Sequence, residues 1–363
     1  MRILHLLTEG RLAGAERVVL DLCEEYRKLG HESAVIFLAP MPDPANEKSS
    51  ILPLLAVAGI PWWSCEASSR HPWRLLRLRH LIRNWSPDVV HAHMYHPSIL
   101  SRLIGRGPWR LVNTIHLVEK RPGKSWRFRF DRWTAGLANV HTAVSAEAAR
   151  WHEDKLGLKC GSIAVIPNGI QRPPRLAVSV LTELRQSWGL NEGKILIGGV
   201  GRLHEQKGWD ILLSSLVELK RLGALDPRWR FVIIGEGAER AGLQALIEDH
   251  LLPVLLPGFR ADAAACMAAF DIFVMPSRYE GFGLTLVEAM AQGLPILCSG
   301  VDSLAAIAAR SNRARCIDFS KPDALADGLQ AGFAIGRGEP EMPFSAATMV
   351  ADYLAAYRST PSK

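Results

Sequence analysis

The 363-residue sequence lacks several features that would place it outside the ordinary globular proteins. Its six cysteines form no C-x-x-C pair, so we expect reduced thiols in a cytosolic protein. The longest apolar run, Ile51–Trp63, contains Pro53 and Pro61 and is shorter than the roughly 20 residues of a membrane span. The N-terminal run Met1–Glu9 becomes charged at once, which predicts a first β-strand and not a signal peptide.

Common nucleotide and nucleic-acid motifs are also missing. The segment Gly10–Glu16 is not a G-x-G-x-x-G motif, so a dinucleotide site is not supported. It does place Gly14 at the start of a predicted helix, where backbone N–H groups can contact phosphate. No recognition helix, aromatic RNA motif or zinc finger is found, and we therefore expect no nucleic-acid partner.

Acidic residues are scarce in the first half of the chain. Residues 1–170 hold 23 of the 43 Lys and Arg but 15 of the 36 Asp and Glu, together with eight of the eleven tryptophans. Arginine and tryptophan are mixed in two stretches, Trp62–Trp85 and Lys120–Trp133. Two explanations remain open: amphipathic helices packed on their own sheet, or a surface that contacts anionic lipid headgroups or a lipid-linked saccharide.

Strand and helix patterns alternate along the whole chain, which predicts an α/β protein with two doubly wound units. The proline-rich linker that follows Pro167–Ile170 predicts a boundary between domains 1–171 and 172–343. A last helix is expected in 344–363. The expected strands are Arg2–Leu7, Ser33–Phe37, Val89–Ala92, Leu111–Ile115, Val140–Val144, Ile163–Ile166, Ile195–Val200, Phe231–Ile234, Val254–Leu256, Ile272–Met275 and Ile296–Cys298.

The most informative segment is Ser277–Pro295. A buried strand precedes it, and a helix over Thr285–Gln292 is predicted within it. Glu280 lies in the glycine turn between them, and Glu288 lies about two helical turns further on. This spacing favours two carboxylates that bind different hydroxyl groups of one elongated ligand. The alternative is a surface glutamate and an ordinary helix glutamate.

A pair of cations follows the strand Ile195–Val200. Arg202 and Lys207 come after a turn at Gly201, and a guanidinium with an ammonium beside glycine backbone suits a diphosphate. Two solvated loop cations are the alternative.

Together with Glu280 and Glu288, the segments Val200–Gly208, Phe231–Gly237 and Leu256–Phe259 resemble the retaining family 4 glycosyltransferases of the GT-B fold. The resemblance covers roughly residues 1–20, 88–93, 112–170 and 195–300. It implies two Rossmann-like domains that face each other across a cleft. Residues 1–171 would lie on the acceptor side, 172–343 would bind a nucleotide-sugar, and 344–363 would form a helix that crosses back to the first domain.

The resemblance also implies roles for individual residues. Glu288 would bind the ribose and Glu280 the donor sugar, while Arg202 and Lys207 would stabilise the diphosphate in place of a metal ion, so that no cofactor is expected. His116 would contact the donor sugar; a structural strand-end histidine is the alternative. The remaining donor-binding residues would be Gly14, Gly201, Phe259, Arg260, Phe282, Gly283 and Leu284, of which Phe259 and Arg260 would lie near the base.

A second histidine group could suggest a metal site. His91 and His93 point to the same side of a predicted strand, which is compatible with ligation. No cysteine or carboxylate cluster accompanies them, so we expect no metal there and place His93 on the acceptor side of the cleft.

The sequence thus predicts a retaining hexosyltransferase, cytoplasmic or peripheral at the inner face of the cytoplasmic membrane. Its donor would be a UDP-sugar, with GDP-mannose as the rival, and its acceptor a hydroxyl of a glycan or lipid-linked saccharide in cell-envelope polysaccharide or lipopolysaccharide synthesis. Two alternatives remain: another GT-B enzyme such as a nucleotide-sugar epimerase, and a basic membrane-surface module without catalysis.

Overall fold

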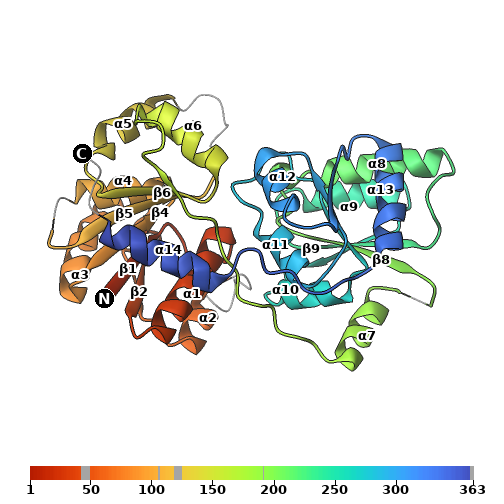
Figure 1. Cartoon of the computed structure of the whole chain (residues 1–363), viewed down its shortest axis with the longest axis horizontal. Helices are drawn as coiled ribbons and strands as arrows, with labels where there is room; N and C mark the ends of the chain where they lie inside the picture. Colours follow the sequence, from red (N-terminus) through yellow and green to blue (C-terminus); the bar gives the residue numbers. More distant parts are fainter. Residues whose placement is uncertain (42–49, 105–106, 118–124, 191, 360–363) are drawn as a thin grey trace. The chain divides into compact units, whose positions relative to one another are not determined.

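The computed structural model describes residues 1–41, 50–104, 107–117, 125–190 and 192–359, without the side chains of 125–127. The chain forms two compact units (Figure 1). The first unites Met1–Gln171 with Phe344–Lys363, and the second is Arg172–Pro343. This division falls at the boundary that the proline-rich linker indicates. Among the described residues, no helix combines the length and the apolar character that a membrane crossing requires.

The first unit is built on a seven-stranded sheet in which every pairing is parallel. The strand order is β3-β2-β1-β4-β5-β6-β7. The strands are β1 (Arg2–Leu7), β2 (Glu32–Phe37), β3 (Trp62–Ser64), β4 (Val89–His93), β5 (Arg110–Ile115), β6 (Val140–Ala143) and β7 (Ala164–Val165). The helices are α1 (Gly14–Lys28), α2 (Leu52–Val57), η1 (Pro72–Leu76), α3 (Arg77–Trp85), α4 (Tyr95–Leu103), α5 (Ser125–Ala135) and α6 (Ala146–Leu156).

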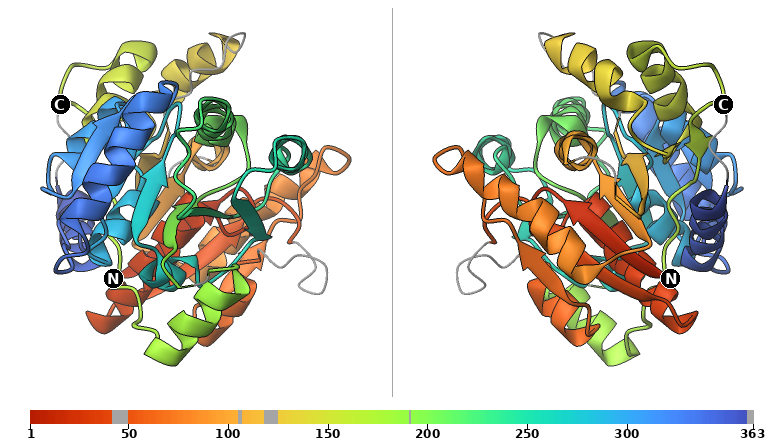
Figure 2. Two further views of the ribbon diagram at one scale, coloured as in Figure 1. Left: turned by 90° about the vertical axis from the view of Figure 1, so that its right-hand side faces the viewer. Right: turned by 90° about the vertical axis from the view of Figure 1, so that its left-hand side faces the viewer.

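Alternating side chains of the central strands pack on opposite faces of this sheet. Leu4 and Leu6 of β1 join a core cluster with α3, whereas Leu7 joins another with α1 and α2. Helices therefore cover both faces (Figure 2), as a parallel sheet requires. The six strands expected in this half are present; β1 has the predicted bounds, and the ends of the others differ by at most one residue. The edge strand β3 was not predicted, because three residues are too few for a periodic pattern.

The last helix, α14 (Ala346–Arg358), belongs to the first unit. Its buried Tyr357 shares a hydrogen bond with Tyr26 of α1 (O–O distance 2.9 Å). The chain enters it through a bridge between Ile170 and Ser345. The expected helix in 344–363 that returns to the first domain is thus present.

The second unit has a six-stranded parallel sheet of order β10-β9-β8-β11-β12-β13. Its strands are β8 (Ile195–Val200), β9 (Trp229–Ile234), β10 (Val254–Gly258), β11 (Ile272–Met275), β12 (Ile296–Ser299) and β13 (Ala314–Ile317). Its helices are α7 (Val178–Ser187), η2 (Glu205–Lys207), α8 (Trp209–Arg221), α9 (Arg240–Asp249), α10 (Ala263–Cys266), η3 (Met267–Ala269), α11 (Leu284–Ala291), α12 (Asp302–Ala308) and α13 (Pro322–Ile335). The four-residue edge strand β13 was not predicted.

In each sheet the direction of winding reverses once. The reversal lies between β1 and β4 in the first unit, and between β8 and β11 in the second. At such a point the loops leaving the two strands diverge, and ligands of open α/β sheets bind beyond the carboxyl ends of the strands there. The loops after β1, β4, β8 and β11 are therefore the places to look for a site.

Candidate active site

An ion pair lies between the ends of β8 and β11, where the direction of winding reverses in the second unit. We call this place the switch point. Lys207, in the loop after β8, donates from Nζ to Oε1 of Glu280, in the loop after β11, over 2.6 Å. Ser277 donates to the same oxygen from Oγ over 2.8 Å. The Glu280 side chain is 8 % exposed, so its position is set by these two donors. Two residues that are 73 positions apart in the chain thus form one charged group at the sheet edge.

Arg202 lies beside this pair but is exposed. Its Nη2 donates to Oε1 of Gln206 over 3.2 Å, and Gln206 in turn donates to the carbonyl of Tyr279 over 3.1 Å. Trp209 donates from Nε1 to the carbonyl of Arg202 over 3.0 Å. The backbone of Arg202 is therefore held in place, while its guanidinium remains accessible to an anion.

Two glycines allow the loops of this site to touch. Gly208 has φ +66°, and a Cβ there would lie 2.1 Å from the carbonyl oxygen of Pro276. A Cβ on Gly235, at the end of β9, would lie 2.0 Å from the carbonyl oxygen of Gly201. Any larger residue would push the loops after β8, β9 and β11 apart, and this close approach explains the glycines in the resembled segments.

The turn before α11 has the geometry that its sequence indicates. Gly283 is the N-cap with φ +110°, and a Cβ there would lie 2.6 Å from Cδ2 of Leu304. No side chain caps this helix end, which leaves the first-turn N–H groups near Leu284 for a bound ligand. Phe282 is buried, and Glu288 is half-buried on α11.

The residues expected near the base follow β10, at the edge of the sheet. Arg260 pairs with Asp262 over 2.8 Å, and its Nε contacts Sγ of Cys266 at 3.1 Å. The hydrogen bond to the Asp262 carboxylate raises the pKa of Arg260 above its ordinary value. The same hydrogen bond lowers the pKa of Asp262 below its ordinary value. Phe259, next to it, is half-buried.

In the first unit, Gly14 is the first residue of α1 and is exposed. The N-cap, Ala13, is extended and provides no side-chain cap, so the helix start presents backbone alone. His116 follows β5 directly and is half-buried. Its Nε2 lies 2.9 Å from Nδ1 of His93, and burial lowers the pKa of His116 to about 4.

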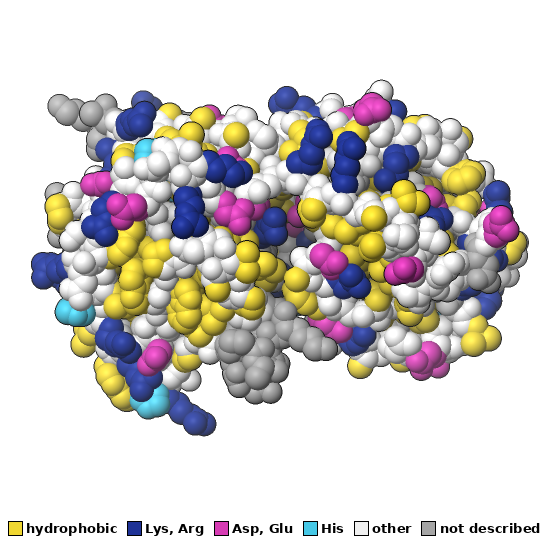
Figure 3. All heavy atoms as spheres, turned by 90° about the horizontal axis from the view of Figure 1, so that it is seen from below, with side chains coloured by type: hydrophobic (Ala, Val, Ile, Leu, Met, Phe, Trp, Pro, Cys, Tyr) yellow, Lys and Arg dark blue, Asp and Glu magenta, His cyan; other side chains and the backbone are white. Residues whose placement is uncertain are grey.

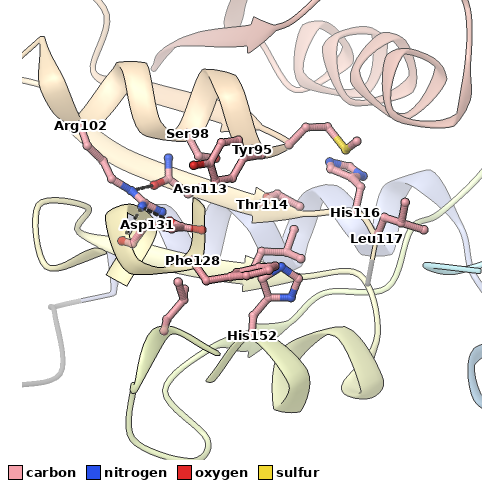
Figure 4. A pocket seen from close by; sticks show the side chains of 13 residues that line it. Tyr95, Ser98, Arg102, Asn113, Thr114, His116, Leu117, Phe128, Asp131 and His152 are labelled. Carbon is pink, nitrogen blue, oxygen red and sulfur yellow. Dashed lines mark hydrogen bonds and ion pairs between the residues drawn. The ribbon is translucent and has the colours of Figure 1, made fainter. Parts of the chain in front are cut away.

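A pocket in the first unit lies between β5 and the helices α4, α5 and α6 (Figure 4). Arg102, at its base, donates from Nε to Oδ1 of Asn113 over 2.7 Å and from Nη1 to the carboxylate of Asp131. Both charges are almost fully buried and neutralise each other. The pocket is lined by Met94, Tyr95, Ser98, Arg102, Asn113, Thr114, Ile115, His116, Leu117, Phe128, Asp131, His152 and Leu156. Its walls are mainly apolar and its floor is electrically neutral.

His93 does not line this pocket, contrary to its expected place on the acceptor side. It is fully buried, because its two ring nitrogens face His116 on one side and His5 on the other. His91, His93 and His5 bring ring nitrogens within 4.8 Å of one another. The sequence did not reveal His5, because only the pairing of β1 with β4 places it opposite His91.

The first Trp and Arg stretch has two kinds of environment. Trp63 and Trp85 pack against a core cluster, and Arg2 lies over the Trp85 ring at 4.6 Å. Trp73 and Leu76 of η1 are 60 % and 82 % exposed. Of the second stretch, Trp133 is 74 % exposed, and residues 120–124 lie outside the described part. On the face drawn in Figure 3, basic and hydrophobic side chains are interspersed.

Comparison with known proteins shows the family of this chain. Glycosyltransferase Family 4 matches residues 12–172, and Glycosyl transferases group 1 matches residues 181–333. The glycosyltransferase EpsF of Bacillus subtilis is 30 % identical over 320 residues, which cover 82 % of this chain and 79 % of EpsF. The chain belongs to glycosyltransferase family 4; it has the GT-B fold and is a hexosyltransferase.

Two further relatives are informative. The UDP-Gal:alpha-D-GlcNAc-diphosphoundecaprenol alpha-1,3-galactosyltransferase of Escherichia coli is 28 % identical over 242 residues, 63 % of this chain and 62 % of that protein. HepE of Anabaena, crystallised with UDP and glucose, superimposes with a TM-score of 0.82 at 20 % identity, covering 99 % of this chain and 100 % of HepE. The HepE likeness shows the fold.

Proposed function

We propose that this enzyme transfers a hexose from a UDP-sugar to a hydroxyl of a glycan or lipid-linked acceptor, with retention of the anomeric configuration. The observation that carries the proposal is the Lys207–Glu280 pair beside Arg202, at the switch point of the second unit. A diphosphate suits the two cations, and a sugar hydroxyl suits the carboxylate. Binding of the two parts of the donor would thus be coupled through a single hydrogen-bonded group.

The mechanism rests on charge stabilisation. Arg202 and Lys207 would neutralise the diphosphate as it departs, the role that a metal ion has in other transferases. Glu280 is a poor candidate for a nucleophile, because Oε1 already accepts from Lys207 and Ser277. Departure and attack on the same face of the sugar would then give retention. Glu288 would hold the ribose, and Phe259 and Arg260 would lie beside the base.

The pocket of the first unit is the proposed acceptor site. Arg102 is committed to Asp131 and Asn113, so the floor offers no unpaired cation for a phosphate. Tyr95 and Phe128 provide aromatic surface, and His116 lies at the rim of the pocket (Figure 4). A neutral sugar residue suits such a site better than an anionic group. The diphosphoundecaprenol-linked acceptor of the E. coli relative supports a role in cell-envelope polysaccharide synthesis.

The nucleotide is tested by thermal unfolding of the full chain with UDP, GDP and the corresponding sugar nucleotides. At a concentration about a hundred times Kd, UDP should raise the midpoint temperature of unfolding by several degrees. Binding at that concentration adds about 2.7 kcal/mol to the free energy of unfolding. Stabilisation by GDP but not by UDP would replace the UDP-sugar with GDP-mannose. Incubation of the donor alone, followed by analysis for a rearranged sugar nucleotide, would reveal an epimerase.

A cytoplasmic enzyme with a lipid-linked acceptor would dock reversibly on the inner membrane face. The exposed Trp73 and Leu76 are the proposed insertion points, since Arg70, Arg74 and Arg77 flank them in the chain. Glu66 pairs with Arg74 and Arg77 at 3.2 and 3.3 Å and neutralises part of this charge. Each remaining cation near an anionic surface contributes about 1 kcal/mol.

Sedimentation with vesicles of anionic or neutral lipid tests this docking. The protein should pellet with anionic vesicles at low salt and be released as salt rises, because screening weakens the attraction. Trp73→Ser should reduce the bound fraction. The control Val178→Ser, at a residue 80 % exposed in the second unit, should not. Protein that stays in the supernatant with anionic vesicles at low salt would indicate a soluble acceptor.

A further inference from the structure

A row of three imidazoles runs from the pocket into the core of the first unit. His116 after β5 is joined to His93 of β4 (Nε2–Nδ1 distance 2.9 Å). His93 is joined through its other nitrogen to Nδ1 of His5 on β1, also at 2.9 Å. His5 and His93 are fully buried, whereas His116 lines the pocket. The row crosses three adjacent strands of the sheet.

Burial opposes the charged form of all three rings and favours the neutral imidazole. It lowers the pKa of His5 to about 3 and that of His116 to about 4, and it holds the pKa of His93 well below its ordinary value. A neutral imidazole donates from one nitrogen and accepts at the other. The row can therefore carry its protons in only two ways. Every N–H points either outward, toward His116 and the pocket, or inward, toward His5.

The inner end of the row distinguishes these two arrangements. Nε2 of His5 is buried and has no hydrogen-bond partner in the described structure. With inward donation, this atom would be an N–H without an acceptor. With outward donation it is only an unused lone pair, and buried N–H groups without an acceptor are the rarer case in proteins. Outward donation makes His93 the donor to Nε2 of His116 and places the His116 proton on Nδ1.

We infer that His93 is a positioning residue that holds His116 in the Nδ1–H tautomer at the rim of the acceptor pocket. Nδ1 of His116 has no hydrogen-bond partner among the described residues, so an oxygen of a bound sugar can accept from it. The consequence for transfer rests on the function proposed above, whereas the tautomer itself does not.

His91 supports this row from the side. Its ring lies 4.0 Å from that of His93 (centroid distance). Its Nδ1 is 2.7 Å from the hydroxyl of Tyr357 on α14, and its Nε2 is 2.6 Å from Oγ1 of Thr114. His91 could ligate a metal with His5 and His93 only by giving up one of these bonds. The observed contacts thus favour a hydrogen-bonded positioning network over a three-histidine metal site.

The tautomer is read directly by long-range 1H–15N NMR of the full-length protein labelled with 15N-histidine, at neutral pH. The His116 signals are assigned by their loss in His116→Asn. We expect a protonated Nδ1 and an unprotonated Nε2. An Nε2–H tautomer, or a doubly protonated ring, would overturn the inference whether or not the protein turns over any sugar nucleotide.

Kinetic variants test the consequence, with release of UDP from the stabilising sugar nucleotide as the probe. His93→Leu should lower kcat about tenfold, the rate equivalent of one hydrogen bond, with KM for the donor little changed. His93→Asn should retain most of the wild-type kcat, because its amide can still donate toward Nε2 of His116. His141→Leu is the matched control: His141 is half-buried on β6, and its Nε2 lies 3.0 Å from the carbonyl oxygen of Ala135, outside the row.

The outcomes separate the two proposals. If His116→Asn abolishes turnover while folded His93→Leu matches the wild type, the positioning role is wrong. Equal losses of kcat in His93→Leu and His141→Leu would also contradict the positioning role, because the effect of His93→Leu would then be a general effect of lost packing. If the wild type shows the Nδ1–H tautomer but neither binds nor hydrolyses any sugar nucleotide, the proposed function is wrong and the positioning of His116 stands.

Discussion

Replacing Arg202 or Lys207 by alanine is expected to lower sugar transfer at least about a hundredfold, with the fold retained. Loss of one preorganised charge at a departing diphosphate costs roughly 3 kcal/mol of transition-state stabilisation. Arg202 is exposed and its side chain bonds only Gln206 among the described residues, so its removal leaves the core intact. The measurement is kcat and KM for the donor, alongside thermal unfolding of each variant.

A matched control lies on the adjacent helix. Arg221 of α8 is a solvent-exposed cation that pairs with Glu218 one turn away, and Arg221→Ala should leave turnover unchanged. Normal turnover in both Arg202→Ala and Lys207→Ala would remove the leaving-group role.

The Lys207 variant carries a second effect, because it leaves the nearly buried Glu280 without its cation. A double-mutant cycle of Lys207→Ala with Glu280→Gln separates the two contributions. A coupling energy near zero would mean that the two residues act independently and would contradict the coupled binding of diphosphate and sugar.

The largest effect on stability is expected at the base of the pocket in the first unit. Asp131→Ala should lower the free energy of unfolding by about 3–5 kcal/mol, because it leaves the Arg102 guanidinium buried without its anion. Thermal and denaturant unfolding of the full chain would measure the loss. Arg102 would keep only neutral acceptors such as Oδ1 of Asn113 and Oγ1 of Thr134.

The control for this prediction removes both charges. Arg102→Met with Asp131→Leu should recover much of the stability, since apolar residues of similar volume commonly replace a buried ion pair without cost. A double variant as unstable as Asp131→Ala would show that packing, and not the unpaired charge, causes the loss. A small effect of Asp131→Ala would mean that water reaches Arg102.

The sequence alone determined the class of fold and the segments that form the charged site of the second unit. Apolar runs such as Ile195–Val200 and Ile272–Met275 become strands with those bounds, because buried parallel strands are continuous apolar segments whatever surrounds them. The glycines at 208 and 283 likewise reflect backbone that has no room for a side chain. Such local requirements depend on consecutive residues, so the sequence alone is enough to indicate the family.

Only the tertiary structure decided which side chains meet. Three groupings join residues from separate elements of the fold: the pairing of Lys207 with Glu280, the neutral floor made by Arg102 and Asp131, and the imidazole row from His116 to His5. Their proximity depends on the order of strands in each sheet, which no local pattern encodes. The same holds for Trp85 and Trp73, which belong to one stretch: one packs against the core and the other faces solvent. Burial is set by which neighbouring element covers a residue, and the amino-acid type alone does not specify that neighbour.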